Sequence, residues 1–252
     1  MIVFRSVLFN VVFYLMLFVY LIAAMPTLLM PRGALLWMVK NWSRLNLRLL
    51  KLICNIDYEF RGLENIPQGA ALIASKHQSM WETFALITVL RDPAYILKRE
   101  LLWIPFFGWC AAKAQMIPVD RGKRSQALAA MTERARAETA KRREIIIFPE
   151  GTRRAPGAEP QYKFGVAFLY SELGVPCVPV ALNSGLFWPR RSFRRFPGVV
   201  RVEFLEPIPP GLDRQVFYDR LQVAIESKTA QLVAMGKRNS SPSPACGGGS
   251  ID

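Results

Sequence analysis

The chain opens on a long apolar run. From Ser6 to Met30 the sequence reads SVLFNVVFYLMLFVYLIAAMPTLLM, 25 residues without a charged side chain. Because a helix of roughly 20 apolar residues crosses the hydrocarbon core of a bilayer, the run predicts a membrane-embedded helix. Pro26 bends or ends such a helix, so the run either spans the membrane or folds back as a buried hairpin. A cleaved signal peptide is the alternative, although AAM before Pro26 matches an A-x-A cleavage site poorly.

Apolar and basic residues follow at helical spacing in ALLWMVKNWSRLNLRLLKLIC (34–54). This composition is typical of an amphipathic helix at the surface of a membrane with anionic headgroups. A helix that packs on the core and has a solvated basic side is the alternative. Only Arg5 precedes the apolar run, whereas the basic residues that come soon after it are Arg32, Lys40, Arg44, Arg48 and Lys51. By the positive-inside rule, we expect the chain beyond the run to be cytoplasmic.

Beyond about residue 55 the pattern changes to short apolar runs separated by helical stretches. The apolar runs predict strands at 71–75, 116–119, 144–148, 177–182 and 199–205. Helices are expected at about 80–90, 123–142, 164–173 and 213–235, the last with Asp213 as its N-cap. Most of the strands are apolar on both faces, which is typical of a parallel sheet covered by helices. The predicted fold class is therefore α/β, with a mainly parallel central sheet flanked by helices and preceded by an N-terminal membrane-embedded helical segment.

These patterns divide the chain into three parts. Residues 1–54 hold the membrane helix and the basic amphipathic helix, and residues 55–235 hold the α/β domain. Residues 236–252, GKRNSSPSPACGGGSID, are rich in Ser, Pro and Gly. Such a composition buries too little apolar surface to fold, so a disordered tail is expected there.

The charge balance narrows the class of partner. Lys and Arg number 33 against 19 Asp and Glu, a formal net charge of +14, which favours nucleic acid, a phospholipid surface or a phosphorylated substrate. The apolar run favours the phospholipid surface, and no nucleic acid partner is expected. The stretch WPRRSFRRF (188–196) mixes Arg190, Arg191, Arg194 and Arg195 with aromatic rings. It suits an anionic membrane surface, with single-stranded nucleic acid and a plain basic loop as alternatives.

The cysteines do not indicate a disulfide framework or a metal site. Cys54, Cys110, Cys177 and Cys246 are widely spaced without a CxxC pair, and the chain has one histidine. A structural zinc site needs four closely placed ligands, so we expect buried thiols in a reducing compartment and no metal.

The single histidine lies in KHQSMWE (76–82), directly after the predicted strand 71–75. Glu82 falls in the first turn of the next helix, from which its carboxylate reaches back toward the strand end. A carboxylate on one imidazole nitrogen fixes the tautomer and leaves the other nitrogen to accept a proton. The alternative is an S-x-x-E capping box, in which Glu82 only binds the backbone of Ser79.

Two other motifs place arginine at a strand end. FPEGTRR (148–154) presents Glu150, Thr152 and Arg153, and PVDRG (118–122) presents Arg121. Arginine holds a phosphate through two parallel hydrogen bonds. The stretch VPCVPVALNS (175–184) is an apolar strand of the kind that lines a pocket.

In this order and spacing, KHQSMWE, PVDRG, FPEGTR and VPCVPVA resemble the four motif blocks of glycerolipid acyltransferases. Over roughly residues 55 to 210 the chain is similar to the bacterial 1-acyl-sn-glycerol-3-phosphate acyltransferases, and LKRELLWIPFFGW (97–109) resembles the K-x-E-L…P-x-x-G-W segment of that family. The resemblance implies that residues 55–235 form the catalytic domain of an enzyme of the inner membrane, facing the cytoplasm. The enzyme would move a fatty acyl group from acyl-CoA or acyl carrier protein to the sn-2 hydroxyl of lysophosphatidic acid.

The resemblance also assigns roles to residues. His77 would be the general base and Glu82 its partner, although the family more commonly has aspartate at the acid position. Arg121 and Arg153 would bind the substrate phosphate, with Lys98 and Lys163 as further candidates. The turn residues Glu150, Gly151 and Thr152 would bind the glycerol part or order the turn, and Val178, Pro179 and Val180 would shape the acyl-donor pocket. No metal or other cofactor is implied, and the acyl donor is a substrate.

Two alternatives stay open on the sequence alone. The same chemistry serves other acceptors: glycerol-3-phosphate, another lysophospholipid or a lyso-aminolipid. A protein of a different class, a membrane-tethered binding protein without catalysis, also fits the basic composition. The donor type, its chain length, the oligomeric state and the effect of Glu82 in place of aspartate are not fixed by the sequence.

Overall fold

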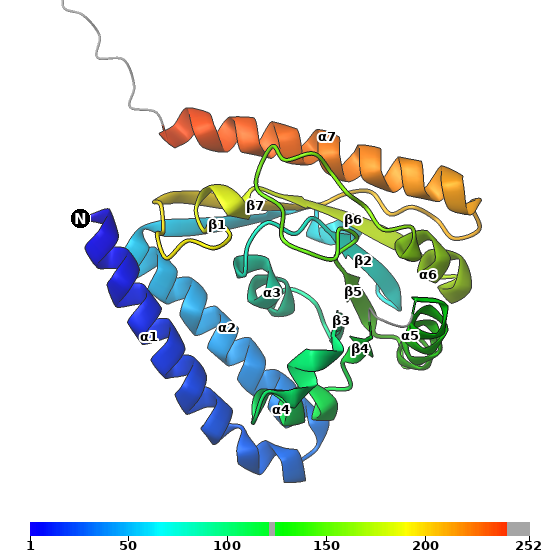
Figure 1. The fold of residues 1–252 in the computed structure, drawn as a ribbon, viewed down its shortest axis with the longest axis horizontal. Helices are drawn as coiled ribbons and strands as arrows, with labels where there is room; N and C mark the ends of the chain where they lie inside the picture. Colours follow the sequence, from blue (N-terminus) through cyan, green and yellow to red (C-terminus); the bar gives the residue numbers. More distant parts are fainter. Residues whose placement is uncertain (121–123, 241–252) are drawn as a thin grey trace, which may run out of the picture.

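The computed structural model describes residues 1–120 and 124–240, which form helices around one sheet (Figure 1). Within the described residues the sheet has seven strands in the order β1-β7-β6-β2-β5-β3-β4. The strands are β1 (Ile56–Arg61), β2 (Ala71–Ser75), β3 (Pro93–Lys98), β4 (Ile117–Val119), β5 (Glu144–Ile147), β6 (Cys177–Leu182) and β7 (Gly198–Phe204). Every neighbouring pair is parallel except β6 and β7. The predicted α/β class with a mainly parallel sheet is confirmed.

Helices cover both faces of this sheet. They are α1 (Ile2–Ala23), α2 (Arg32–Cys54), α3 (Trp81–Ala85), α4 (Phe107–Lys113), α5 (Arg124–Thr139), α6 (Gly165–Leu173) and α7 (Arg214–Ser240). Successive β2 residues alternate between two cores, because side chains of a strand point to opposite faces. Ala71 and Ile73 pack with α1, α2 and α3, whereas Leu72 and Ala74 pack with α5, α6 and α7. The full burial of both faces explains why the central strands are apolar throughout.

Two strands were not predicted from the sequence. The β1 segment, IDYEFR, lies at one edge of the sheet and pairs only with β7 in the described structure, so polar residues face outward along it. The β3 segment, PAYILK, begins with proline and ends with lysine. The β1 segment lacks the continuous apolar pattern of the central strands, and in β3 the apolar run lies between Asp92 and Lys98.

The helix boundaries differ from the predicted ones in three places, the first being the helix predicted at about 123–142, which ends at Thr139. The stretch predicted as helix 80–90 is divided into α3 and a 3-10 turn, η3 (Leu86–Thr88). The prediction that the tail begins at residue 236 is wrong for 236–240, since α7 continues to Ser240. Gly236 packs so tightly against Leu186 and Asn183 that a Cβ would lie 2.6 Å from the first and 3.0 Å from the second. This tertiary contact joins the end of α7 to the loop after β6, and the local composition does not reveal it. Residues 241–252 of the predicted tail lie outside the described residues.

The N-terminal apolar run packs against the helix that follows it. Helix α1 ends at Ala23, Pro26 lies in the 3-10 turn η1 (Met25–Leu29), and α2 returns along α1 (Figure 1). In the described chain the run from Ile2 to Leu29 is the one helical stretch long and apolar enough to cross a membrane, by length and composition. Helices α1 and α2 form a helical hairpin, and whether α1 spans a membrane or lies in one leaflet stays a prediction.

Helix α1 is docked onto the domain along one side. Phe9 and Phe13 are fully buried in the core beside α2 and α3, and burial of such a ring contributes about 1.5–3 kcal/mol. Asn10 Nδ2 donates to the carbonyl of Phe193, and Arg195 Nη2 donates to Asn10 Oδ1 at 2.7 Å. The opposite side of α1 exposes large apolar side chains, Phe4 and Phe18 among them. One side of α1 therefore packs in the hydrophobic core, and the other side is free to contact lipid.

Arg195 does not face outward as the basic stretch 188–196 suggested. Its side chain is buried, and its guanidinium lies 4.0 Å from the centroid of the Trp188 ring. Burial lowers the pKa of Arg195 to about 10. Arg191 and Arg194 are exposed, so the basic surface of this loop is narrower than the sequence indicates.

Candidate active site

The site is built at the carboxyl end of β2. His77 lies two residues beyond the end of this strand, and Glu82 lies in the first turn of α3. Nδ1 of His77 is 2.9 Å from Oε1 of Glu82. The same Oε1 accepts hydrogen bonds from the backbone N–H groups of Gln78 and Ser79, both at 2.7 Å. One carboxylate oxygen thus makes the contacts of both interpretations, to the backbone N–H of Ser79 and to the imidazole of His77.

The carboxylate of Glu82 is fully buried, whereas the His77 side chain is 14% exposed and lines a cavity. With Nδ1 directed at Glu82, Nε2 is the nitrogen left for a substrate. A buried carboxyl group needs hydrogen-bond partners, and the two backbone N–H groups supply donors to Oε1. The contact with Glu82 can therefore fix the tautomer of the imidazole from the Nδ1 side.

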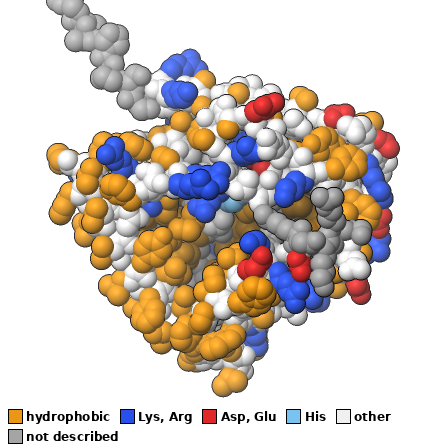
Figure 2. Space-filling model, viewed as in Figure 1, with side chains coloured by type: hydrophobic (Ala, Val, Ile, Leu, Met, Phe, Trp, Pro, Cys, Tyr) orange, Lys and Arg blue, Asp and Glu red, His pale blue; other side chains and the backbone are white. Residues whose placement is uncertain are grey.

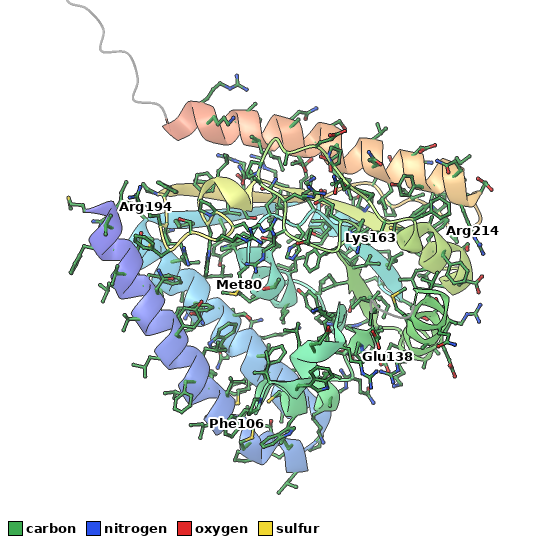
Figure 3. All side chains as sticks on the ribbon, in the orientation of Figure 1. Met80, Phe106, Glu138, Lys163, Arg194 and Arg214 are labelled. Carbon is green, nitrogen blue, oxygen red and sulfur yellow. The ribbon has the colours of Figure 1, made fainter. Side chains whose placement is uncertain are left out.

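A cavity of about 800 Å³ extends from His77 between the N-terminal hairpin and the sheet. Among the candidates from the sequence, those that line its polar end are His77, Lys98, Gly151, Arg153 and Lys163. Figure 3 labels Lys163, just before α6, and Met80, just before α3, both of which line the cavity. The remainder of the lining is mainly apolar. Side chains from distant parts of the chain therefore meet in one cavity, where Lys98, Arg153, Lys163 and the acidic Asp120 lie in the same lining as the imidazole.

The FPEGTR turn is held against the histidine loop. Gly151 adopts φ = +64°, a conformation that glycine reaches without strain, and its N–H donates to the carbonyl of Phe148. The N–H of Arg154 donates to the carbonyl of His77 at 2.8 Å. The backbone carbonyl of Arg153 accepts a hydrogen bond from Nη1 of Arg190 at 2.8 Å. These bonds set the position of Arg153 relative to the imidazole.

Glu150 points away from the cavity. Its Oε1 lies 2.9 Å from Nζ of Lys76, which also binds Glu226 of α7 at 2.7 Å, and Tyr162 donates to Glu226 at 2.8 Å. Lys76 and Glu150 are almost completely buried. Burial raises the pKa of Glu150, although the charge of Lys76 opposes the shift. Of the two roles predicted for Glu150, the geometry supports ordering of the turn.

Other predicted residues lie elsewhere. Thr152 is exposed beside the turn. Val178, Pro179 and Val180 are buried in β6, and the described residues that line the cavity include none of them. Their position gives no support to the predicted role in the acyl-donor pocket.

Arg121, a predicted phosphate-binding residue, lies outside the described residues. Lys98 forms an exposed ion pair with Glu100 at 2.9 Å, at the rim of the cavity.

Two residues of the site were missed in the sequence. Phe148, the first residue of FPEGTR, lies against the imidazole ring of His77. Ser184 donates its hydroxyl to Oε2 of Glu82 at 2.8 Å. A signal existed for both, since Phe148 belongs to the third motif block and Ser184 comes soon after the fourth.

Metal and cysteine predictions can be compared with the described residues only. Residues 1–120 and 124–240 contain no group of three or more His, Cys, Asp or Glu side chains arranged to hold a metal. Cys54, Cys110 and Cys177 are buried free thiols, as expected for the first three cysteines. Cys246 lies outside the described residues.

Comparison with known proteins agrees with these motifs. An acyltransferase family model matches residues 57–183, which include His77, Glu82 and the FPEGTR turn. The chain is 39% identical over 166 residues to the 1-acyl-sn-glycerol-3-phosphate acyltransferase of Pseudomonas aeruginosa, covering 66% of this chain and 65% of that protein. It is 31% identical over 205 residues to the alpha form of Homo sapiens, covering 76% and 72%. The chain belongs to this acyltransferase family.

The family resemblance read from the motifs is thus confirmed. The chain spans 65% of the length of the Pseudomonas aeruginosa relative and 62% of the alpha form of Mus musculus. A solved structure agrees in fold, the crystal structure of the 1-acyl-sn-glycerophosphate (LPA) acyltransferase PlsC from Thermotoga maritima. It matches with a TM-score of 0.76 and 22% identity, covering 97% of this chain and 100% of that one.

Proposed function

We propose that this protein transfers a fatty acyl group from a thioester donor to the sn-2 hydroxyl of lysophosphatidic acid, which yields phosphatidic acid. The observation that carries the proposal is the shared cavity, in which the His77 imidazole and the cations Lys98, Arg153 and Lys163 face the same space. Acyl transfer to a lipid that carries a phosphate monoester needs two features of the site. A base accepts the proton of the hydroxyl, and cations at one end of an apolar channel bind the phosphate.

The proposed reaction begins with the His77–Glu82 pair. Nε2 of His77 accepts the proton of the sn-2 hydroxyl as its oxygen attacks the thioester carbonyl. The tetrahedral intermediate collapses, the carbon–sulfur bond breaks, and the departing thiolate takes the proton from the imidazolium. Glu82 stabilises the imidazolium through Nδ1 and keeps Nε2 directed at the substrate. No acyl-enzyme forms in this scheme, in keeping with the absence of a G-x-S-x-G motif from the sequence.

The cationic side chains of the cavity indicate which class of acceptor it binds. Arg153 offers a planar guanidinium for two parallel hydrogen bonds, and the side chain of Lys163, just before α6, lies close to Gly151. A phosphate monoester carries close to two negative charges at neutral pH, which these side chains balance. This favours lysophosphatidic acid over a lyso-aminolipid, and the apolar lining favours it over glycerol-3-phosphate, which has no acyl chain.

The apolar part of the cavity suits acyl chains. It is lined from one side by the hairpin, with Leu17 and Leu21 of α1 and Met38 of α2. From the other side it is lined by α5 and α6, with Met131 and Val166. Because the hairpin forms one wall, an acyl chain in the cavity contacts the segment that faces lipid. Both acyl-CoA and acyl carrier protein present a suitable thioester on a long arm.

We further propose that the hairpin lies in the cytoplasmic leaflet of a bacterial inner membrane, with the catalytic domain in the cytoplasm. Hydrophobic side chains gather over α1, α2 and α4 on the face shown in Figure 2, with Lys and Arg around the hollow beside them. Leu29 at the tip of the hairpin is 95% exposed, Trp103 in the 3-10 turn before α4 is 71% exposed, and Trp109 on α4 is 55% exposed. Tryptophan is enriched at the level of lipid headgroups. This placement opens the cavity toward the lipid that supplies the acceptor.

The test is thiol release from oleoyl-CoA by the full-length protein in nanodiscs, with and without lysophosphatidic acid. We expect release that depends on lysophosphatidic acid and is lost in His77→Ala. Glycerol-3-phosphate and lysophosphatidylethanolamine are the competing acceptors, and acyl carrier protein the competing donor. Equal rates with lysophosphatidylethanolamine would contradict the role of the cations. No release with any donor and acceptor would favour the membrane-tethered binding protein.

A further inference from the structure

The two oxygens of Glu82 have different environments. Oε1 faces Nδ1 of His77 and two backbone N–H groups, whereas Oε2 accepts the hydroxyl of Ser184 at 2.8 Å. We propose that Ser184 is a positioning residue of the catalytic pair. Its hydroxyl fixes the rotation of the Glu82 carboxylate, so that one oxygen is always presented to the imidazole. This inference rests on the proposed function of His77 as the base.

The sheet order brings Ser184 to this place. Strands β2 and β6 are parallel neighbours, and Ser75 is paired with Val180. Their carboxyl ends therefore lie side by side, with His77 in the loop after β2 and Ser184 in the loop after β6. A second bond joins the same two loops, because the N–H of Gly185 donates to Oε1 of Gln78 at 3.1 Å.

Ser184 is held rigidly enough to orient another group. It is fully buried at the start of the 3-10 turn η5 (Ser184–Leu186), and its carbonyl accepts the N–H groups of Phe187 and Trp188. A buried carboxylate oxygen without a donor is costly, so the hydroxyl has a strong reason to remain bound to Oε2. The bond joins residues 102 positions apart in the sequence.

The arrangement gives Glu82 a function that aspartate would not share. Glutamate has one more rotatable bond than aspartate, so its carboxylate has access to more rotamers. An aspartate at this position is shorter by one methylene group and would not reach His77 and Ser184 together. Ser184 thus restrains the longer side chain, and the two residues should be coupled in their effect on rate.

Loss of the hydroxyl should affect the chemical step and not substrate binding. Ser184 does not line the cavity among the described residues. In Ser184→Ala, Oε2 loses its donor and the carboxylate turns, so we expect kcat to fall by about 10- to 100-fold. KM for lysophosphatidic acid should stay within about twofold, because Lys98, Arg153 and Lys163 are untouched. Ser184→Thr, which keeps a hydroxyl, should retain more activity than Ser184→Ala.

The first measurement is a double-mutant cycle with the full-length protein, using Ser184→Ala, Glu82→Asp and their combination. We expect Ser184→Ala to cost about tenfold or more in kcat beside Glu82, and less than about twofold beside aspartate. Ser43→Ala is the matched control, because Ser43 is equally buried and its hydroxyl has no partner in the described structure. An equal cost of Ser184→Ala in both backgrounds would overturn the proposal. If Ser184→Ala does not fold, Ser184→Cys, which keeps the volume but donates weakly, replaces it.

The second measurement does not require turnover. His77 is the only histidine of the chain, so ¹⁵N-histidine labelling of protein with a histidine-free tag gives the signals of a single imidazole. We expect Nδ1 to carry the proton in the wild type and the Nε2-protonated tautomer to gain population in Ser184→Ala. An unchanged tautomer in Ser184→Ala together with an unchanged kcat would overturn the positioning role. A wild type without acyltransferase activity would instead contradict the proposed function, while the tautomer still reports on the contact.

Discussion

The imidazole of His77 lies flat against the ring of Phe148, with centroids 4.0 Å apart and planes inclined by 18°. Phe148 is the first residue of the FPEGTR motif. The proposed base, which belongs to the KHQSMWE motif, therefore stacks on a residue of a second motif. Glu82 holds the imidazole at its edge through Nδ1, and Phe148 covers its face. Together they restrict the ring in two directions.

Replacing Phe148 with alanine should therefore slow the chemical step. The imidazole would gain freedom to tilt, and we expect kcat to fall by about tenfold, because loss of an aromatic contact of this kind costs about 0.5–1.5 kcal/mol beyond the area buried. Phe148→Leu should lie between wild type and alanine. Phe168→Ala is the control, because Phe168 is a half-buried ring on α6 that is not among the residues lining the cavity. Equal kcat in Phe148→Ala and Phe168→Ala would show that the ring is not needed to hold His77.

Two glycines with positive φ separate backbone strain from an effect on the site. Gly151 has φ = +64°, and a Cβ there would lie 3.3 Å from Nζ of Lys163, whereas Gly157 has φ = +81° and nothing within 4 Å. Alanine in this conformation costs about 1–2 kcal/mol, so both variants should lose similar stability. Only Gly151→Ala should displace Lys163, with kcat/KM for lysophosphatidic acid lower by about tenfold. Thermal melts and kinetics of the two variants provide the comparison. An equal loss of kcat/KM in Gly157→Ala would show that displacement of Lys163 does not cause the loss in Gly151→Ala.

The buried ion pair of Lys76 and Glu150 should be sensitive to removal of its cation. Their charged atoms lie 2.9 Å apart with 3% and 1% of the side chains exposed. Lys76→Met leaves Glu150 without its partner, which costs about 3–5 kcal/mol and lowers Tm by roughly 10 °C. Lys228→Met, which breaks a more exposed pair with Glu203, should cost less than about 1 kcal/mol. Equal melting temperatures of the two variants would mean that Glu150 takes up a proton when Lys76 is lost.

Acid should weaken the junction between the hairpin and the domain at Asp92. Burial by itself raises the pKa of Asp92, but the hydrogen bond from Arg32 and the charge of Arg143 outweigh it, so the pKa lies below its ordinary value. A carboxyl with a lowered pKa stabilises the fold above the unfolded-state pKa of about 3.9, and this contribution is lost as the pH falls through the folded-state pKa.

We therefore expect Asp92→Asn to lose about 1–3 kcal/mol at pH 7, with the difference from wild type shrinking below about pH 4. Melting curves between pH 3 and pH 7 measure this. Asp219→Asn, at an exposed position on α7, is the control. A difference between Asp92→Asn and wild type that stays constant across this range would contradict the ionic origin of the stabilisation.

The sequence determined the features that depend on neighbouring residues. Apolar runs buried on both faces marked the central strands β2, β5 and β6, and the helical spacing marked α2 and α7. The five-residue separation of His77 and Glu82 placed base and carboxylate on one strand-to-helix loop. Asp213 was recognised as an N-cap, and it does accept the N–H of Gln215 at 2.7 Å. In each case the interacting residues are close in sequence, so the pattern can be recognised from the sequence alone.

The tertiary structure decided the features that depend on which strands become neighbours. The order β6-β2-β5 places Ser184 on Glu82 and Lys76 on Glu150, contacts of 102 and 74 residues in sequence separation. Composition also does not distinguish an apolar side chain that faces lipid from one that faces a core. The run read as a membrane segment buries Phe9 and Phe13 in the domain and gives Leu17 and Leu21 to the wall of the cavity. Apolar residues lose contact with water equally in either setting, so only the folded chain shows which of them build the site.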